Sequence, residues 1–165
     1  MAYIRTAIEI DISEKSLANI LVSYFSRPNS RWKAFVPNCY TLSENECDLF
    51  GIRKSLLTDE FEIKISRQDF LQDKLKQVRF NYGEWYNKQD AYTKGLMPTN
   101  YFWYVTFDGI CNKDDIPDFA GWVEISKYGM IRVHKEAPKT NKTKMPEKDI
   151  IHHLMKLSKK FWNQG

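Results

Sequence analysis

The clearest pattern in the chain is a strict alternation of charged and apolar residues over positions 60–65. The charged residues Glu60, Glu62 and Lys64 alternate with three apolar residues. Because side chains two apart on a strand share a face, the pattern predicts a β-strand with one face against a core and one charged face.

Helical spacing of apolar residues precedes this strand. Ser13 is a suitable N-cap, and the residues expected on the buried face are Leu17, Ile20, Leu21, Tyr24 and Phe25. Turn-forming residues at 27–30 end this helix. We expect strands over 33–40 and 48–53, and a turn over 54–59 that leads into the charged strand.

A second helix is predicted directly after the charged strand. Ser66 with Asp69 three residues later forms a capping-box pattern. The residues expected to be buried by this helix are Phe70, Leu71, Leu75 and Val78, and those expected to face water or substrate are Asp73, Lys74 and Lys76. Residues 81–100 predict a surface excursion, in which Tyr82, Trp85, Tyr86 and Tyr92 either pack onto the domain or form a base-stacking platform.

The remaining elements complete an α/β fold. We expect a buried strand over 101–107, an antiparallel pair over 121–125 and 130–134 that turns at 128–129, and an amphipathic helix over 146–162. A length of 165 residues favours one domain over 1–165, with a central mixed sheet flanked by helices.

Candidate chemistry lies on two of these strands. If the strands are neighbours, Asp48, Glu62 and Lys64 converge. Two carboxylates with the backbone carbonyl of Ile63 suit Mg²⁺, which prefers oxygen ligands. A lysine beside the metal would orient the attacking water and stabilise charge on a phosphate. The alternative is a solvated strand face with a surface ion pair worth about 0–1 kcal/mol.

The chain resembles the PD-(D/E)XK nuclease superfamily, and most closely its small MmcB-like and phage-borne members. The segments that carry the resemblance are 48–52, 62–70, 73–74, 98–105, 116–123 and 133–139, within a region of roughly residues 13–160. Cys47 precedes Asp48, so the proline that names the superfamily is absent.

The resemblance implies a restriction-endonuclease-like core of αβββαβ order, with a further β-pair and helix at its C-terminal end. It implies that Asp48 and Glu62 bind Mg²⁺ or Mn²⁺ and that Lys64 assists the attacking water in DNA hydrolysis. A glutamate of the first helix sometimes completes such sites. Glu14 is the first candidate and Glu9 the second, but an acid after Ser13 is also what a helix start favours.

Substrate contacts are expected from Ser66, Lys74 and Lys88. A net charge of +4 permits nucleic-acid binding without arguing for it. Basic residues cluster at three places, which are either solvated loops or phosphate contacts. The clusters are Arg27, Arg31 and Lys33, then Arg53 and Lys54, then Lys139, Lys142 and Lys144.

Three cysteines without CxxC spacing and the lack of an apolar leader favour a reducing, cytoplasmic setting, in a bacterium or a phage-infected cell. No apolar run approaches the roughly 18 residues of a membrane span, so we expect no membrane contact. The leading hypothesis is a Mg²⁺- or Mn²⁺-dependent deoxyribonuclease with DNA as partner, and nuclease domains of this size often form homodimers. The alternatives are a non-catalytic nucleic-acid- or protein-binding module and a structural or regulatory phage protein.

Overall fold

The computed structural model describes residues 9–40, 46–80 and 83–163. Its main element is a six-stranded sheet of order β1-β2-β3-β6-β7-β8. The strands are β1 (Trp32–Tyr40), β2 (Glu46–Arg53), β3 (Thr58–Lys64), β6 (Tyr101–Phe107), β7 (Ala120–Ile125) and β8 (Ile131–Lys135). β1, β2 and β3 pair antiparallel, β3, β6 and β7 pair parallel, and β8 returns antiparallel to β7, so the sheet is mixed.

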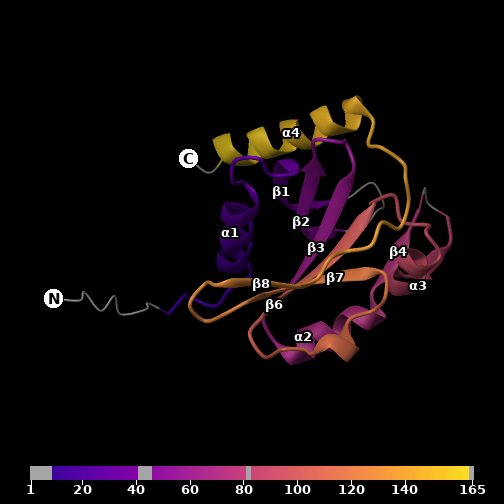
Figure 1. The fold of residues 1–165 in the computed structure, drawn as a ribbon. Coiled ribbons are helices and arrows are strands. Elements are labelled where there is room, and N and C mark those ends of the chain that lie inside the picture. The colour runs from indigo at the N-terminus through magenta and orange to yellow at the C-terminus, as the bar shows by residue number, and fades with distance from the viewer. Residues whose placement is uncertain (1–8, 41–45, 81–82, 164–165) are drawn as a thin grey trace.

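Helices flank this sheet, as Figure 1 shows. They are α1 (Glu14–Phe25), α2 (Arg67–Gln72), α3 (Lys88–Thr93) and α4 (Glu147–Trp162), with 3₁₀ turns η1 (Asp73–Leu75) and η2 (Lys113–Asp115). α1 packs on one face against the main aromatic and aliphatic core. On the other face, α4 covers β1 and β2, while α2 and α3 pack against β6 and β7. The predicted α/β class with a mixed, helix-flanked sheet is confirmed.

α1 begins where its capping signal predicts. The Ser13 hydroxyl accepts a hydrogen bond from the Ser16 amide at 3.2 Å, which satisfies one of the free amides of the first turn. Leu17, Leu21 and Phe25 are buried at helical spacing. The chain then turns through Asn29 with φ 68°, a left-handed conformation that asparagine tolerates well.

A buried carboxylate ties four strands together on the α1 face. Asp59 accepts hydrogen bonds from the indole nitrogens of Trp32 at 3.0 Å and Trp103 at 2.8 Å, and from Arg53 Nε at 2.6 Å. Its side chain is fully buried, so these donors replace the water it loses.

The turn expected over 54–59 is too long, because β3 already begins at Thr58.

The predicted helix after Ser66 is wrong in its length. α2 ends at Gln72, and Val78 lies on β4 (Gln77–Arg79), which pairs with β5 (Trp85–Asn87). Leu71 and Leu75 are exposed by 42% and 75%, whereas Asp73, expected to face outward, is buried. The physical reason is that the Tyr104 hydroxyl donates to Asp73 at 2.6 Å and holds that carboxylate inside.

The surface excursion expected over 81–100 is also only partly right. It contains β5 and α3. Tyr92 is buried in the second core cluster, so this residue packs onto the domain and is not available to stack on a base. Trp85 is exposed, and Tyr82 lies outside the described residues.

The predicted strand over 101–107, the final strand pair and the closing helix are confirmed as β6, β7, β8 and α4. Gly129 has φ 73°, a left-handed conformation that glycine adopts without strain, at the turn between β7 and β8. In the part of the chain that the structure describes, no helix has both the length and the apolar character needed to cross a membrane.

Candidate functional site

The candidate site lies where β2 and β3 part. Their ladder ends at the pair Leu49 and Phe61, while β2 continues beside β1 and β3 continues beside β6. Asp48 and Glu62 are the next residues beyond that last pair, where the two strands have separated. The Ile63 amide donates to Asp48 Oδ2 at 2.7 Å, so the carboxylate bridges the opening between the strands.

A cavity of about 370 Å³ opens at this fork. Its lining includes Glu14 and Asn19 from α1, Asn38 from β1, Asp48 from β2 and Ile63 from β3. Three of the predicted metal ligands, namely Asp48, Ile63 and Glu14, thus border one space. Glu14 also occupies the first turn of α1, so its two interpretations are compatible.

Glu9, the second candidate from the N-terminal region, lies elsewhere. It is 65% exposed and accepts a hydrogen bond from Lys127 at 3.0 Å. It does not line the cavity that Asp48 and Glu14 share.

The surroundings of the Asp48 carboxyl disfavour its ionised form. Burial and, to a smaller extent, the nearby negative charge of Glu62 raise its pKa to about 6, against the lowering effect of the hydrogen bond from the Ile63 amide. Among the described residues, the Ile63 amide is the single hydrogen-bond donor to this carboxylate. Two neighbouring carboxylates, one of them poorly solvated and weakly paired, form an environment that favours a cation.

Glu62, the fourth predicted ligand, does not line this cavity and is fully buried within a cluster of lysines. One carboxylate oxygen lies 2.5 Å from Lys88 Nζ. The other lies 2.6 Å from Lys76 Nζ and 3.3 Å from Lys64 Nζ. Burial alone would raise the pKa of Glu62, but the three ammonium groups together lower it well below its usual range.

Two further acids complete this ionic cluster. Asp73 lies 3.4 Å from Lys64 Nζ and 3.1 Å from Lys76 Nζ. Glu60 lies 2.5 Å from Lys88 Nζ. Burial lowers the pKa values of Lys76 and Lys88, but the acids raise them above the ordinary lysine value, so both of these lysines are charged at neutral pH.

Lys64 therefore meets Glu62 in a polar, buried setting, since its side chain is 4% exposed and surrounded by carboxylates. The predicted charged face of β3 is a charged layer inside the protein rather than a solvated surface. The alternation over 60–65 indicated which residues share this face, but nothing in the sequence pattern pointed to Lys76 or Asp73 as their partners.

The predicted substrate contacts are dispersed. Ser66 is the N-cap of α2, where its hydroxyl accepts a hydrogen bond from the Asp69 amide at 3.2 Å. Lys74 is exposed on η1. Lys88 is 2% exposed and held between Glu60 and Glu62, so its ammonium supports the site from within.

The described side chains contain no group of three or more histidine, cysteine, aspartate or glutamate residues arranged to hold a metal ion. Magnesium does not require such a group, because one or two carboxylates together with substrate oxygens and water suffice. Asp48, Glu14 and the Ile63 backbone border one space and are donors of that kind, whereas the oxygens of Glu62 are held by Lys76 and Lys88 outside the cavity lining. The raised pKa of Asp48 is the feature of this fork that a bound cation would relieve.

Comparison with known proteins bears on the fold alone. No family model matches the chain, and no curated protein matches it. Among solved structures, the chain is similar to the SPO1766 protein of unknown function from Silicibacter pomeroyi, with a TM-score of 0.59 and 15% sequence identity. The match covers 94% of this chain and 90% of the other, so the two share an architecture over nearly their whole lengths.

Proposed function

We propose that the protein is a metal-dependent deoxyribonuclease of the PD-(D/E)XK type. The observation that carries the proposal is the fork of β2 and β3, where the amide of Ile63, the residue after Glu62, donates to the Asp48 carboxylate just beyond the last paired residues. The order of elements supports it, because α1, the antiparallel β1, β2 and β3, then α2 and the parallel β6 follow the αβββαβ arrangement of a restriction-endonuclease-like core.

In this proposal, Asp48, Glu62 and the Ile63 carbonyl hold one divalent cation, and Glu14 of α1 borders the space that Asp48 and Ile63 line. A bound Mg²⁺ or Mn²⁺ would neutralise phosphate charge and lower the pKa of a coordinated water. The protein supplies the fixed carboxylates, and the partly buried fork strengthens their attraction for positive charge.

Lys64 is the residue we assign to the attacking water and the phosphate. Its ammonium is held by Glu62, Asp69 and Asp73 at 3.3–3.7 Å, which fixes its position beside the fork. A positioned ammonium stabilises negative charge that develops on a phosphate in the transition state. It costs no reorganisation at that moment because its carboxylate partners already orient it.

Lys76 would compete with a metal ion for the Glu62 carboxylate. Its Nζ is 2.6 Å from Glu62, yet its side chain is 42% exposed on the chain that follows η1. It can therefore leave Glu62 for solvent or for a substrate phosphate without unfolding its surroundings, whereas the buried Lys88 cannot.

One observation favours a second candidate, a binding module that keeps the fold without catalysis. The Glu62 carboxylate is engaged by three ammonium groups, as a purely structural ion cluster would require. In that case, metal affinity would be absent and Glu62 would serve stability alone.

DNA cleavage with matched variants tests the proposal. Purified protein is incubated with labelled linear, circular and single-stranded DNA across a panel of divalent metals, and Asp48→Asn, Glu62→Gln and Lys64→Gln are compared with wild type. We expect cutting with Mg²⁺ or Mn²⁺, its loss with EDTA, and at least a roughly 100-fold loss in each variant. Asp114→Asn, an exposed aspartate on η2, is the charge-matched control and should cut normally. Cutting that persists in EDTA, or equal activity in Asp48→Asn and wild type, would refute the assignment.

A further inference from the structure

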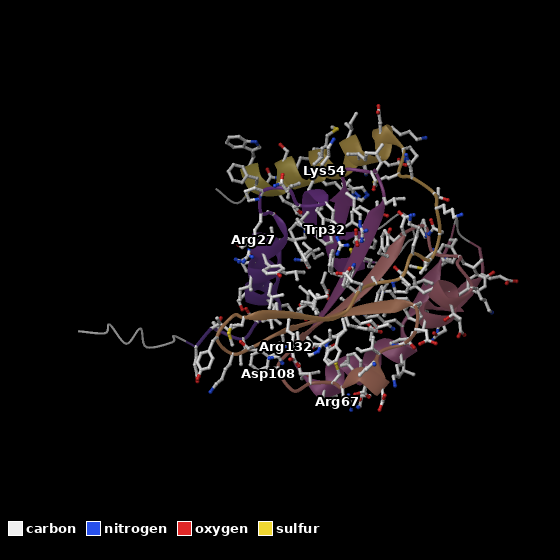
Figure 2. All side chains as sticks on the ribbon, viewed as in Figure 1. Arg27, Trp32, Lys54, Arg67, Asp108 and Arg132 are labelled. Atoms are coloured by element: carbon white, nitrogen blue, oxygen red, sulfur yellow. The ribbon has the colours of Figure 1, made fainter. Side chains whose placement is uncertain are left out.

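A second cavity, of about 500 Å³, lies at the other end of α1. It is bordered by the turn that follows α1, by the start of β1, by Lys54 after β2 and by Leu157 of α4. Figure 2 shows Arg27, Trp32 and Lys54 in this part of the molecule, between α1 and α4. Its volume is in the range of sites that bind small molecules or segments of larger ligands, about 300–1,000 Å³.

The charge of this cavity is uncompensated. Arg27, Lys33 and Lys54 line it, and its lining contains no aspartate or glutamate. Within the described part of the chain, none of these three cations forms an ion pair. The neighbouring cations differ, since Arg31 pairs with Glu136 at 2.8 Å and Arg53 with the buried Asp59.

Local structure holds the three cations around one space. The Lys54 amide donates to the Arg31 carbonyl at 2.8 Å, which ties the end of β2 to the entry of β1. The Arg27 guanidinium lies 4.3 Å from the centre of the Tyr24 ring, which orients it beside α1. Ser26, Asn29 and Ser30 add uncharged polar groups to the same wall. Three unpaired cations with such groups suit a phosphate.

The cationic cavity and the candidate metal site are bordered by the same two elements, α1 and β1. The first half of α1 and the end of β1 border the site at Asp48, while the last turn of α1 and the start of β1 border the cationic cavity. Both cavities thus lie between the same helix and the same edge strand. They lie toward opposite ends of α1, and from Glu14 to Phe25, at 1.5 Å per residue, these ends are about 17 Å apart.

We infer that the cationic cavity of Arg27, Lys33 and Lys54 binds a backbone phosphate of the nucleic-acid strand whose scissile phosphate lies at Asp48. This inference rests on the proposed nuclease function. Phosphates on one strand advance about 3.4 Å per nucleotide along a duplex axis, so about 17 Å corresponds to about five nucleotides. The site would hold the strand in register along the groove between α1 and β1, without reading its sequence.

Binding without metal tests the inference separately from catalysis. The affinity of full-length protein for a fluorescein-labelled 12-nucleotide DNA is measured by anisotropy in EDTA, at several salt concentrations. The cavity variant replaces Arg27, Lys33 and Lys54 by Gln. The control replaces Lys94, Lys113 and Lys148, which are exposed elsewhere, so both variants lose the same charge. Asp48→Asn is measured in parallel.

We expect the cavity variant to bind at least about tenfold more weakly and to show a salt dependence reduced by two to three phosphate contacts, while the control changes less than about twofold. Asp48→Asn should bind at least as tightly as wild type in EDTA, because it removes a negative charge that repels the phosphate. Equal loss in the cavity and control variants would overturn the inference. So would displacement of the DNA by micromolar 5′-AMP or inorganic phosphate, because the cavity would then be built for a free phosphomonoester.

The outcomes also separate the two proposals. If the cavity variant loses affinity but wild type never cuts DNA with any metal, the phosphate site stands and the nuclease function fails. If wild type cuts and the cavity variant binds and cuts as wild type does, the nuclease function stands and the phosphate site fails. Melting temperatures of all variants check that each remains folded, as expected for exposed side chains.

Discussion

Replacing Asp48 by Asn is expected to stabilise the metal-free protein while it removes activity. Burial and the charge of Glu62 raise the pKa of Asp48 from 3.8 to about 6. One pKa unit corresponds to about 1.4 kcal/mol, so the ionised carboxylate costs the fold roughly 3 kcal/mol. Asparagine keeps an oxygen that can accept the hydrogen bond from the Ile63 amide, so the substitution removes the charge and retains the contact.

The sign of this effect depends on pH. In the unfolded chain the carboxyl ionises near its ordinary pKa, whereas in the folded protein it stays protonated until about pH 6. The unfolded state therefore releases its proton first, and wild type loses stability as the pH rises from about 4 to above 6. The advantage of Asp48→Asn should be near zero at pH 4 and reach about 2–3 kcal/mol at pH 8.

Urea unfolding in EDTA at pH 4, 6 and 8 measures this advantage, with Asp114→Asn as an exposed control that should show none. With saturating Mn²⁺ at pH 8, wild type should become more stable than Asp48→Asn. The reason is that a ligand that binds only the native state stabilises the protein that binds it, which is wild type and not the variant. An Asp48→Asn protein that is less stable than wild type at pH 8, or an advantage that is the same at pH 4 and pH 8, would show that this reasoning is wrong.

Three other substitutions test the buried charges. Lys88→Met should destabilise the fold by about 3–5 kcal/mol in urea unfolding, because it leaves buried Glu60 and Glu62 without the cation they share; a loss below about 1 kcal/mol would contradict this role. Lys76→Met should lower the free energy of unfolding by less than Lys88→Met, because the Lys76 side chain is 42% exposed. It should also tighten Mn²⁺ binding in calorimetry, because it removes the ammonium that competes with the ion at Glu62. Unchanged or weaker Mn²⁺ affinity would exclude this competition. Asp59→Ala should cost about 3–5 kcal/mol by leaving Arg53 buried without its partner, whereas a neutral result in thermal unfolding would mean that the indole groups and Arg53 find other acceptors.

The elements with long periodic patterns were predictable from the sequence. α1 carries apolar residues at helical spacing behind a capping serine, β3 shows period-two alternation of charged and apolar residues, and β6 is a nearly continuous apolar and aromatic run. The helical spacing arises from burial of one face and the apolar run from burial of both, so local sequence is enough to reveal these elements. The predicted convergence of Asp48 with Glu62 depends on placing their strands side by side, and β2 and β3 are antiparallel neighbours whose ladder ends one residue before these two positions.

The segment between Leu71 and Asn100 was not predictable to the same extent. β4, β5 and α3 are three to six residues long, too short for a period to appear. Exposed Leu75 and Trp85 and buried Asp73 and Lys88 reverse the usual preference of these residue types. Their places are decided by partners far away in the chain, such as Tyr104 for Asp73 and Glu62 for Lys88.

Crystals soaked in Mn²⁺ offer the most direct measurement of the central claim, because the anomalous signal locates the ion independently of activity. The account predicts one strong peak in the fork between β2 and β3, in contact with Asp48 and Glu62, and no peak in crystals of Asp48→Asn. A fork without a peak at saturating Mn²⁺, with Lys76 still bound to Glu62, would contradict it.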